Sequence, residues 1–142
     1  KVLVLCKLFC FGLLFLAFSA PSPGYSENVP LALIQDSFYP LPDYTRMETV
    51  CFRFSRFHLP QIKSLEGKHP RLYFDLHPVV EYDGRAKKSV NGTLIYSIRT
   101  FLHREEKRLR VVVDLNSDYN YHVEQRCSAM KKTMCLVIQA EE

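Results

Sequence analysis

The chain has 142 residues, with 19 lysines and arginines against 15 acidic residues, and it is 47% apolar and 24% charged. A chain of about this length usually forms one domain, and these fractions are ordinary for a folded soluble protein. They exclude a disordered chain, a collagen-like chain and a disulfide-dense mini-protein.

Residues 1–26 have the pattern of a secretory signal peptide. Lys1 and Lys7 are the only charges, an apolar run covers residues 8–18 apart from one glycine, and small residues and prolines follow. The alternative is an uncleaved anchor, although Lys7 interrupts the apolar stretch that would have to span the bilayer. We therefore expect an exported, periplasmic protein that meets a membrane only through this leader if it stays uncleaved.

Residues 27–43 are predicted to form an acidic, proline-rich tether. Proline removes a backbone donor and opposes both a long helix and a central strand. Three apolar residues of the tether are expected to dock it on the body: Leu31, Leu33 and Ile34.

Residues 44–142 are predicted to form one all-β domain. Short runs alternate apolar and polar residues with a period of two, and glycine, proline or the turn dipeptide Asn91-Gly92 separate them. A single helical turn at residues 59–65 is the one exception that we expect. These features favour an antiparallel β-sandwich or barrel. A short polar piece at residues 86–90 ends at the Asn91-Gly92 turn, and the predicted strands cover residues 50–57, 71–76, 93–102, 108–115, 119–125 and 133–139.

A weak internal sequence repeat, called the echo below, favours the sandwich. Residues 71–76 and 110–115 share the order Arg, three apolar residues, Asp, Leu, and an apolar strand with a basic residue near its end precedes each. A strand–loop–strand unit used twice predicts two similar small sheets, packed face to face with pseudo-symmetry. The alternative is a chance similarity, since apolar triplets are common in β proteins.

The order of these motifs resembles the AMIN domain of bacterial envelope proteins. The match rests on Ser-Ile-Arg at 97–99, Arg-Val-Val-Val-Asp-Leu at 110–115, Tyr-His-Val at 121–123 and Leu-Val-Ile at 136–138, within about residues 47–139. That family accompanies N-acetylmuramoyl-L-alanine amidases and type IV pilus secretins. The resemblance implies a sandwich of two similar small sheets that binds peptidoglycan or targets a partner to the wall. Since neither partner domain follows in this sequence, we expect the domain to stand alone.

Catalysis is not expected. The body's histidines show no His-x-x-x-His or His-Glu-x-x-His spacing, so they predict no metal site. No nucleophile elbow, phosphate loop or dinucleotide fingerprint occurs, and no cofactor is implied. The leader carries two lysines and no acid, so the body is nearly neutral and does not predict nucleic-acid binding.

Three cysteines remain in the body. Cys127 and Cys135 flank a turn near Lys131, so a bridge between them would staple the last hairpin. The alternative leaves Cys135 as a buried apolar residue and Cys127 as a free thiol. Either way, Cys51 is the odd cysteine and is expected to be buried.

The candidate binding residues are basic and aromatic side chains on strand faces. Arginine can hold a carboxylate through two parallel hydrogen bonds, and peptidoglycan offers carboxylates on its stem peptides and muramyl lactyl groups. Aromatic rings would stack on sugars. The alternative is a solvated outer face that protects the sheets from aggregation. Asp75 and Asp114 are then structural, and they either pair with neighbouring arginines or cap the turns that follow. The candidates are Arg53, Arg56, Tyr73, Tyr96, Arg99, Arg108 and Arg110.

These observations predict a non-catalytic module that contacts peptidoglycan. The alternative function is a protein–protein adaptor that docks to a secretin or amidase complex of the envelope through a sheet edge or surface contacts.

Overall fold

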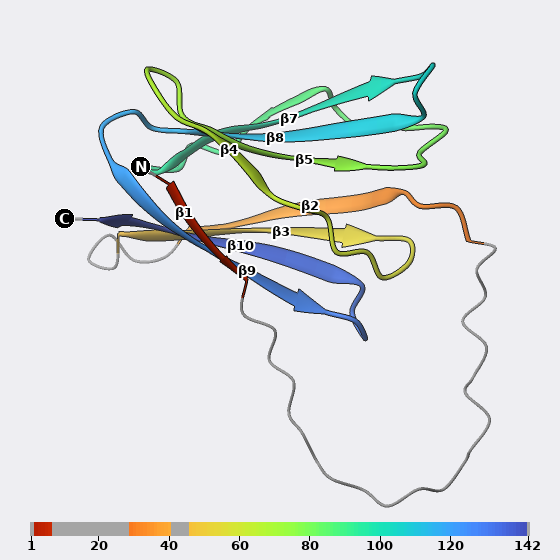
Figure 1. The fold of residues 1–142 in the computed structure, drawn as a ribbon, viewed down its shortest axis with the longest axis horizontal. Helices are drawn as coiled ribbons and strands as arrows, with labels where there is room; N and C mark the ends of the chain where they lie inside the picture. Colours follow the sequence, from red (N-terminus) through yellow and green to blue (C-terminus); the bar gives the residue numbers. More distant parts are fainter. Residues whose placement is uncertain (1, 7–28, 41–45, 142) are drawn as a thin grey trace, which may run out of the picture.

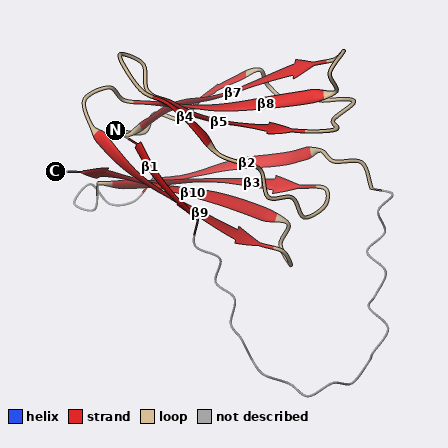
Figure 2. Ribbon diagram, viewed as in Figure 1, coloured by secondary structure: helices blue, strands red, loops and turns tan. Residues whose placement is uncertain are grey.

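The computed structural model describes residues 2–6, 29–40 and 46–141. Within these ranges every regular element is a strand, and the strands form two packed sheets (Figures 1 and 2). The chain is therefore the β-sandwich that its alternating pattern predicts. The predicted helical turn at residues 59–65 is wrong, because Lys63–Leu65 forms a strand that pairs with its neighbour.

The first sheet has the strand order β1-β9-β10-β3-β2. All of its pairs are antiparallel except β1 with β9, which is parallel. The strands are β1 (Val2–Cys6), β2 (Leu33–Pro40), β3 (Met47–Phe54), β9 (Asn120–Ser128) and β10 (Thr133–Glu141).

The second sheet has the order β4-β5-β8-β7-β6 and is antiparallel throughout. Its two edges are strands of only three residues, which limits how far another chain could pair with them. The strands are β4 (Lys63–Leu65), β5 (Arg71–Leu76), β6 (Lys87–Ser89), β7 (Ile95–His103) and β8 (Arg108–Leu115).

The predicted leader lies only partly within the described residues. Its residues 2–6 form β1 on the edge of β9, whereas residues 7–26 lie outside the described ranges. Export and cleavage of the leader stay predictions.

The predicted tether at residues 27–43 is wrong for residues 33–40, which form β2 and belong to the sandwich. Proline permits this because β2 lies at the sheet edge and Pro40 is its last residue. Leu31 and Leu33 are buried as expected, but Ile34 is 53% exposed. The folded domain therefore begins earlier than residue 44.

The core lies between the sheets and follows from the alternation. In β5 and β8, every second residue is buried and the residues between them face outward. Phe52 of β3 meets Phe74 of β5 edge to face, with ring centroids 5.0 Å apart. This contact and its neighbours fix the first sheet against the second.

The two echo segments lie side by side in one sheet. Antiparallel pairing places Arg71 opposite Asp114 and Asp75 opposite Arg110, so each arginine of the motif faces the aspartate of the other copy. The predicted packing of two strand–loop–strand units face to face is wrong. β3 and β5 belong to different sheets, whereas β7 and β8 pair within one.

The disulfide joins Cys51 to Cys135, so the predicted bridge from Cys127 to Cys135 is wrong. The reason is strand register. Across the last hairpin Cys127 lies opposite Met134, one residue away from the predicted pairing, while Cys135 lies opposite Cys51 on β3. Cys127 is exposed and outside the bridge.

A buried carboxylate holds the turn before β7. Glu48 of β3 is 5% exposed and accepts hydrogen bonds from the backbone N–H groups of Thr93, Leu94 and Ile95 at 2.6–3.1 Å. Gly92 fits beneath it, because an added Cβ would lie 2.5 Å from a Glu48 oxygen. The chain reverses between β6 and β7 at Thr93 and Leu94, directly after the predicted Asn91-Gly92 turn, since the Gly92 N–H donates to the Ile95 carbonyl at 3.1 Å. A side chain of the opposite sheet anchors this turn.

Candidate functional site

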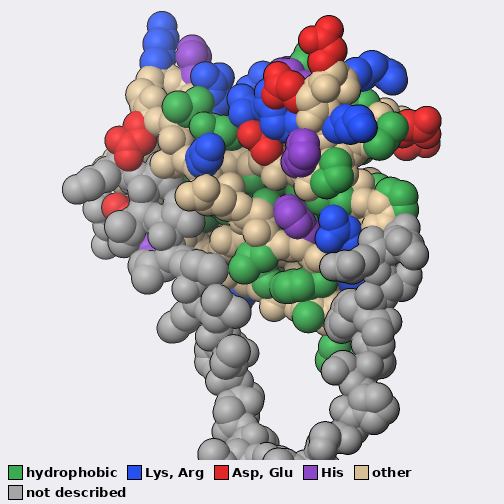
Figure 3. Space-filling model, turned by 45° about the vertical axis from the view of Figure 1, so that its right-hand side comes forward, with side chains coloured by type: hydrophobic (Ala, Val, Ile, Leu, Met, Phe, Trp, Pro, Cys, Tyr) green, Lys and Arg blue, Asp and Glu red, His purple; other side chains and the backbone are tan. Residues whose placement is uncertain are grey.

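The outer face of the second sheet gathers most of the candidate residues. No helix or strand within the described ranges lies over this face (Figure 1). Charged side chains of both signs crowd the upper part of the molecule, where this sheet lies (Figure 3). The strand pairings bring Tyr73, Arg99, Arg108 and Arg110 onto this face, and Tyr96 joins them at its margin.

The other two predicted residues lie elsewhere. Arg53 belongs to β3 in the first sheet, where its guanidinium donates to Gln35 at 3.2 Å. Arg56 follows β3, and its Nε is buried without a hydrogen-bond partner among the described residues. The predicted set is therefore divided between two regions, and neither of these arginines can serve the face of the second sheet.

Arg110 is held by the sheet itself. Its Nε and Nη2 each donate to Asp75 at 2.8 Å, and its guanidinium lies 4.8 Å from the centre of the Tyr73 ring. Arg108 adds a longer contact to Asp75 at 3.4 Å. The hydrogen bonds from Arg110 hold the pKa of Asp75 below its usual value. One face of the Tyr73 ring is thus occupied by Arg110.

Arg99 is held in the same way by Asp114. Two guanidinium nitrogens donate to its carboxylate at 2.6 and 2.5 Å, and the Ser97 hydroxyl donates at 2.6 Å. Burial alone would raise the pKa of Asp114, but the hydrogen bonds from Arg99 and Ser97 outweigh it, so the pKa is lowered. The expected pairing of both motif aspartates with arginines is confirmed.

Two aromatic side chains project from β7 toward solvent. The pairing of β7 with β8 shifts register between Ile95 and Ser97, which leaves Tyr96 as an extra residue that is 54% exposed. Phe101 is 62% exposed and contacts the His103 ring at 4.5 Å between centroids. Sequence reasoning missed Phe101, although it alternates with Arg99 and so shares its face.

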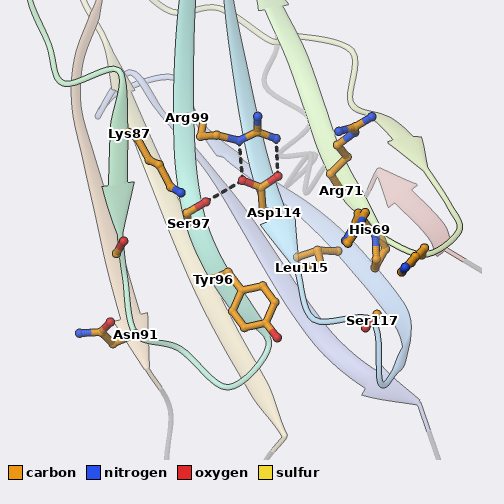
Figure 4. Close-up of a pocket in the computed structure, with 13 residues that line it drawn as sticks. His69, Arg71, Lys87, Asn91, Tyr96, Ser97, Arg99, Asp114, Leu115 and Ser117 are labelled. Atoms are coloured by element: carbon orange, nitrogen blue, oxygen red, sulfur yellow. Dashed lines mark hydrogen bonds and ion pairs between the residues drawn. The ribbon is translucent and has the colours of Figure 1, made fainter.

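A shallow cavity of about 590 Å³ opens at one end of this face. Figure 4 shows Lys87 and Arg71 on opposite sides of the Arg99–Asp114 pair, with Tyr96 nearby. Sequence reasoning missed both cations. Arg71 shares the period-two alternation of Tyr73 and could have been found, but Lys87 comes from β6, whose place beside β7 no local pattern reveals. The remaining lining residues include Lys68 and His69.

Metal chemistry has no structural support in the described part of the chain. There, no group of three or more histidine, cysteine or acidic side chains is arranged to hold a metal ion. The same residues contain no helix long and apolar enough to cross a membrane.

Comparison with known proteins gives no relative. No protein-family model, curated protein or solved structure matches the chain. The resemblance to the AMIN domain therefore stays a prediction.

Proposed function

We propose that this protein is a non-catalytic binding module that contacts peptidoglycan through the outer face of the second sheet. The observation that carries the proposal is a sheet face that no described strand covers and that combines two exposed aromatic rings with several cations. The resemblance to the AMIN domain suggests peptidoglycan as the ligand, and the side chains of this face have the chemistry to recognise it.

The aromatic residues would bind the sugars. Tyr96 and Phe101 project from one strand and are more than half exposed, so a ring of either can cover an apolar sugar face. Tyr73 is less suited, since Arg110 covers one face of its ring. The cations would attract the carboxylates of the polymer, and salt would screen that attraction.

Sedimentation with purified peptidoglycan sacculi tests the proposal. Wild-type protein should enter the pellet, less at high salt, and the Tyr96→Ala/Phe101→Ala double variant should bind about tenfold more weakly. Tyr39→Ala is the matched control, because Tyr39 is also about half exposed but belongs to β2 of the other sheet. Arg99 and Arg110 are poorer choices, since replacing them removes ion pairs between strands.

The outcome also addresses the adaptor alternative. If wild-type protein stays in solution with sacculi, wall binding is wrong and docking to an envelope complex becomes the leading proposal. If the double variant and Tyr39→Ala both bind like wild type, the protein binds the wall but not through these rings.

A further inference from the structure

We propose that the cavity beside Tyr96 is a seat for a free carboxylate of the ligand, with Arg71 as its principal donor and Lys87 and Lys68 as supporting cations. The inference rests on the proposed function for the identity of the polymer. It adds which chemical group is recognised and which residue recognises it.

The first argument is that the two arginines of the repeated segment do not bind alike. The two Arg-x-x-x-Asp segments pair antiparallel, so Arg110 faces Asp75 and Arg71 faces Asp114. Arg110 takes the carboxylate that it faces with two hydrogen bonds. Arg71 does not, because Arg99 from β7 reaches Asp114 instead.

Arg71 is consequently left with unused donors. Its guanidinium makes no side-chain hydrogen bond to any residue that the structure describes, although its charge is felt by Asp114. A guanidinium offers a rigid fork of donors that matches a carboxylate through two parallel bonds. The structure therefore presents one arginine of the repeat as satisfied and the other as open.

The second argument is the charge of the cavity. Four cationic side chains line it, and the only carboxylate among the lining residues, Asp114, already accepts three hydrogen bonds. Lys87 and Lys68 make no side-chain hydrogen bond within the described ranges. A ligand anion would thus meet three cations, Lys68, Arg71 and Lys87, that form no ion pair within the described residues, beside one carboxylate that Arg99 already holds. The four cations are Lys68, Arg71, Lys87 and Arg99.

The third argument is the neighbourhood of the seat. Tyr96 lines the same cavity and is 54% exposed, so a sugar ring on Tyr96 would present its substituents to Arg71 and Lys87. A volume of about 590 Å³ lies within the range of small-ligand sites, which is about 300–1,000 Å³. The seat therefore suits a sugar that carries a free acid, such as a muramyl residue whose lactyl group is not joined to a stem peptide.

Two ligands that differ by one acid test the seat in the full chain. N-acetylmuramic acid carries a lactyl carboxylate that N-acetylglucosamine lacks, so we would titrate each and follow the backbone amide resonances by NMR. We expect the acidic sugar to shift resonances of residues that line the cavity and to bind about tenfold more tightly than the neutral sugar. Arg71→Ala should abolish this preference, whereas Arg53→Ala on the other sheet should keep it.

Sacculi provide the second measurement. Amidation of their carboxylates should weaken binding of wild-type protein about as much as Arg71→Ala weakens binding to untreated sacculi. The variant should then be insensitive to amidation. Equal affinity of wild type and Arg71→Ala for untreated sacculi would overturn the seat while leaving wall binding intact.

The two failures are distinguishable. If sacculi do not bind but the acidic sugar still shows the Arg71-dependent preference, the seat stands and the polymer is wrong. If neither sugar is preferred by wild-type protein, the seat is wrong whatever the sacculi do. Arg71→Lys separates charge from geometry, and we expect it to restore only part of the preference because lysine lacks the planar fork.

Discussion

Arginine–aspartate pairs dominate the outer face of the second sheet. Each aspartate offsets the positive charge of its arginine, so the arginines of this face repel one another less. Each pair joins neighbouring strands, Arg110 to Asp75 and Arg99 to Asp114. Both pairs are partly solvated, so their contribution to the free energy of unfolding is modest. Their main effect is to fix the positions of two guanidinium groups, of which that of Arg99 lines the cavity together with Arg71.

These pairs predict a loss of stability in acid. The pKa values of Asp75 and Asp114 are lowered in the folded protein, so the carboxylates stabilise the fold above the ordinary carboxyl pKa of about 4. The stabilisation is lost as the pH falls from there through the lowered values. Urea unfolding should show a difference between wild type and Asp75→Asn that is full at pH 7 and shrinks toward pH 2. A difference that does not change with pH would contradict this role.

Glu48 predicts a larger effect from a single residue. Glu48→Ala should lower the free energy of unfolding by about 3 kcal/mol, because it leaves three backbone N–H groups of the turn without their acceptor. Denaturant unfolding would measure the loss. Glu81→Ala is the control, since Glu81 is exposed, and it should change the free energy by less than about 0.5 kcal/mol.

At the scale of elements, alternation located strands but not their register. The strands at residues 71–76 and 108–115 have the predicted bounds, because each buries every second side chain. The predicted Cys127–Cys135 bridge is wrong because the last hairpin pairs Cys127 with Met134, one residue away from the expected register. The prolines of residues 27–43 oppose a central strand but not an edge strand, and no local pattern indicates that residues 33–40 pair with the sheet edge as β2.

The disulfide between β3 and β10 gives the prediction for this scale. Cys51→Ser should lower the free energy of unfolding by about 2–4 kcal/mol, since the bridge closes a long loop of the unfolded chain. Thermal unfolding with and without reductant would measure the effect. Cys127→Ser should keep the reductant sensitivity of wild type, and loss of that sensitivity would contradict the observed pairing.

At the scale of the whole molecule, the site follows from sheet order more than from any one motif. In the second sheet β5 and β6 flank the adjacent strands β8 and β7, so Arg71 and Lys87 border one cavity that lies across those two strands. Local alternation predicts that the arginines of β8 and β7 lie on the faces of strands. It could not predict which strands would be neighbours, so the cavity was beyond sequence reasoning.

The domain boundary can be tested with adjacent residues of β2. Leu33 is buried and Ile34 is 53% exposed, so they share a strand but not an environment. Leu33→Ala should lower the free energy of unfolding by about 2 kcal/mol, and Ile34→Ala by less than about 0.5 kcal/mol. Equal and small effects in denaturant unfolding would return residues 33–40 to the role of a tether.

The Cys51–Cys135 bridge also sets how the protein responds to mechanical load. It joins positions 84 residues apart, which as an extended chain would span about 290 Å. A force that pulls residues before Cys51 away from residues after Cys135 is carried by the covalent bond. The residues between the two cysteines, which include the cavity and the second sheet, do not bear that force. Under such a load the described strand residues outside the bridge would peel away, namely β1, β2, the start of β3 and the end of β10, while the second sheet kept its shape.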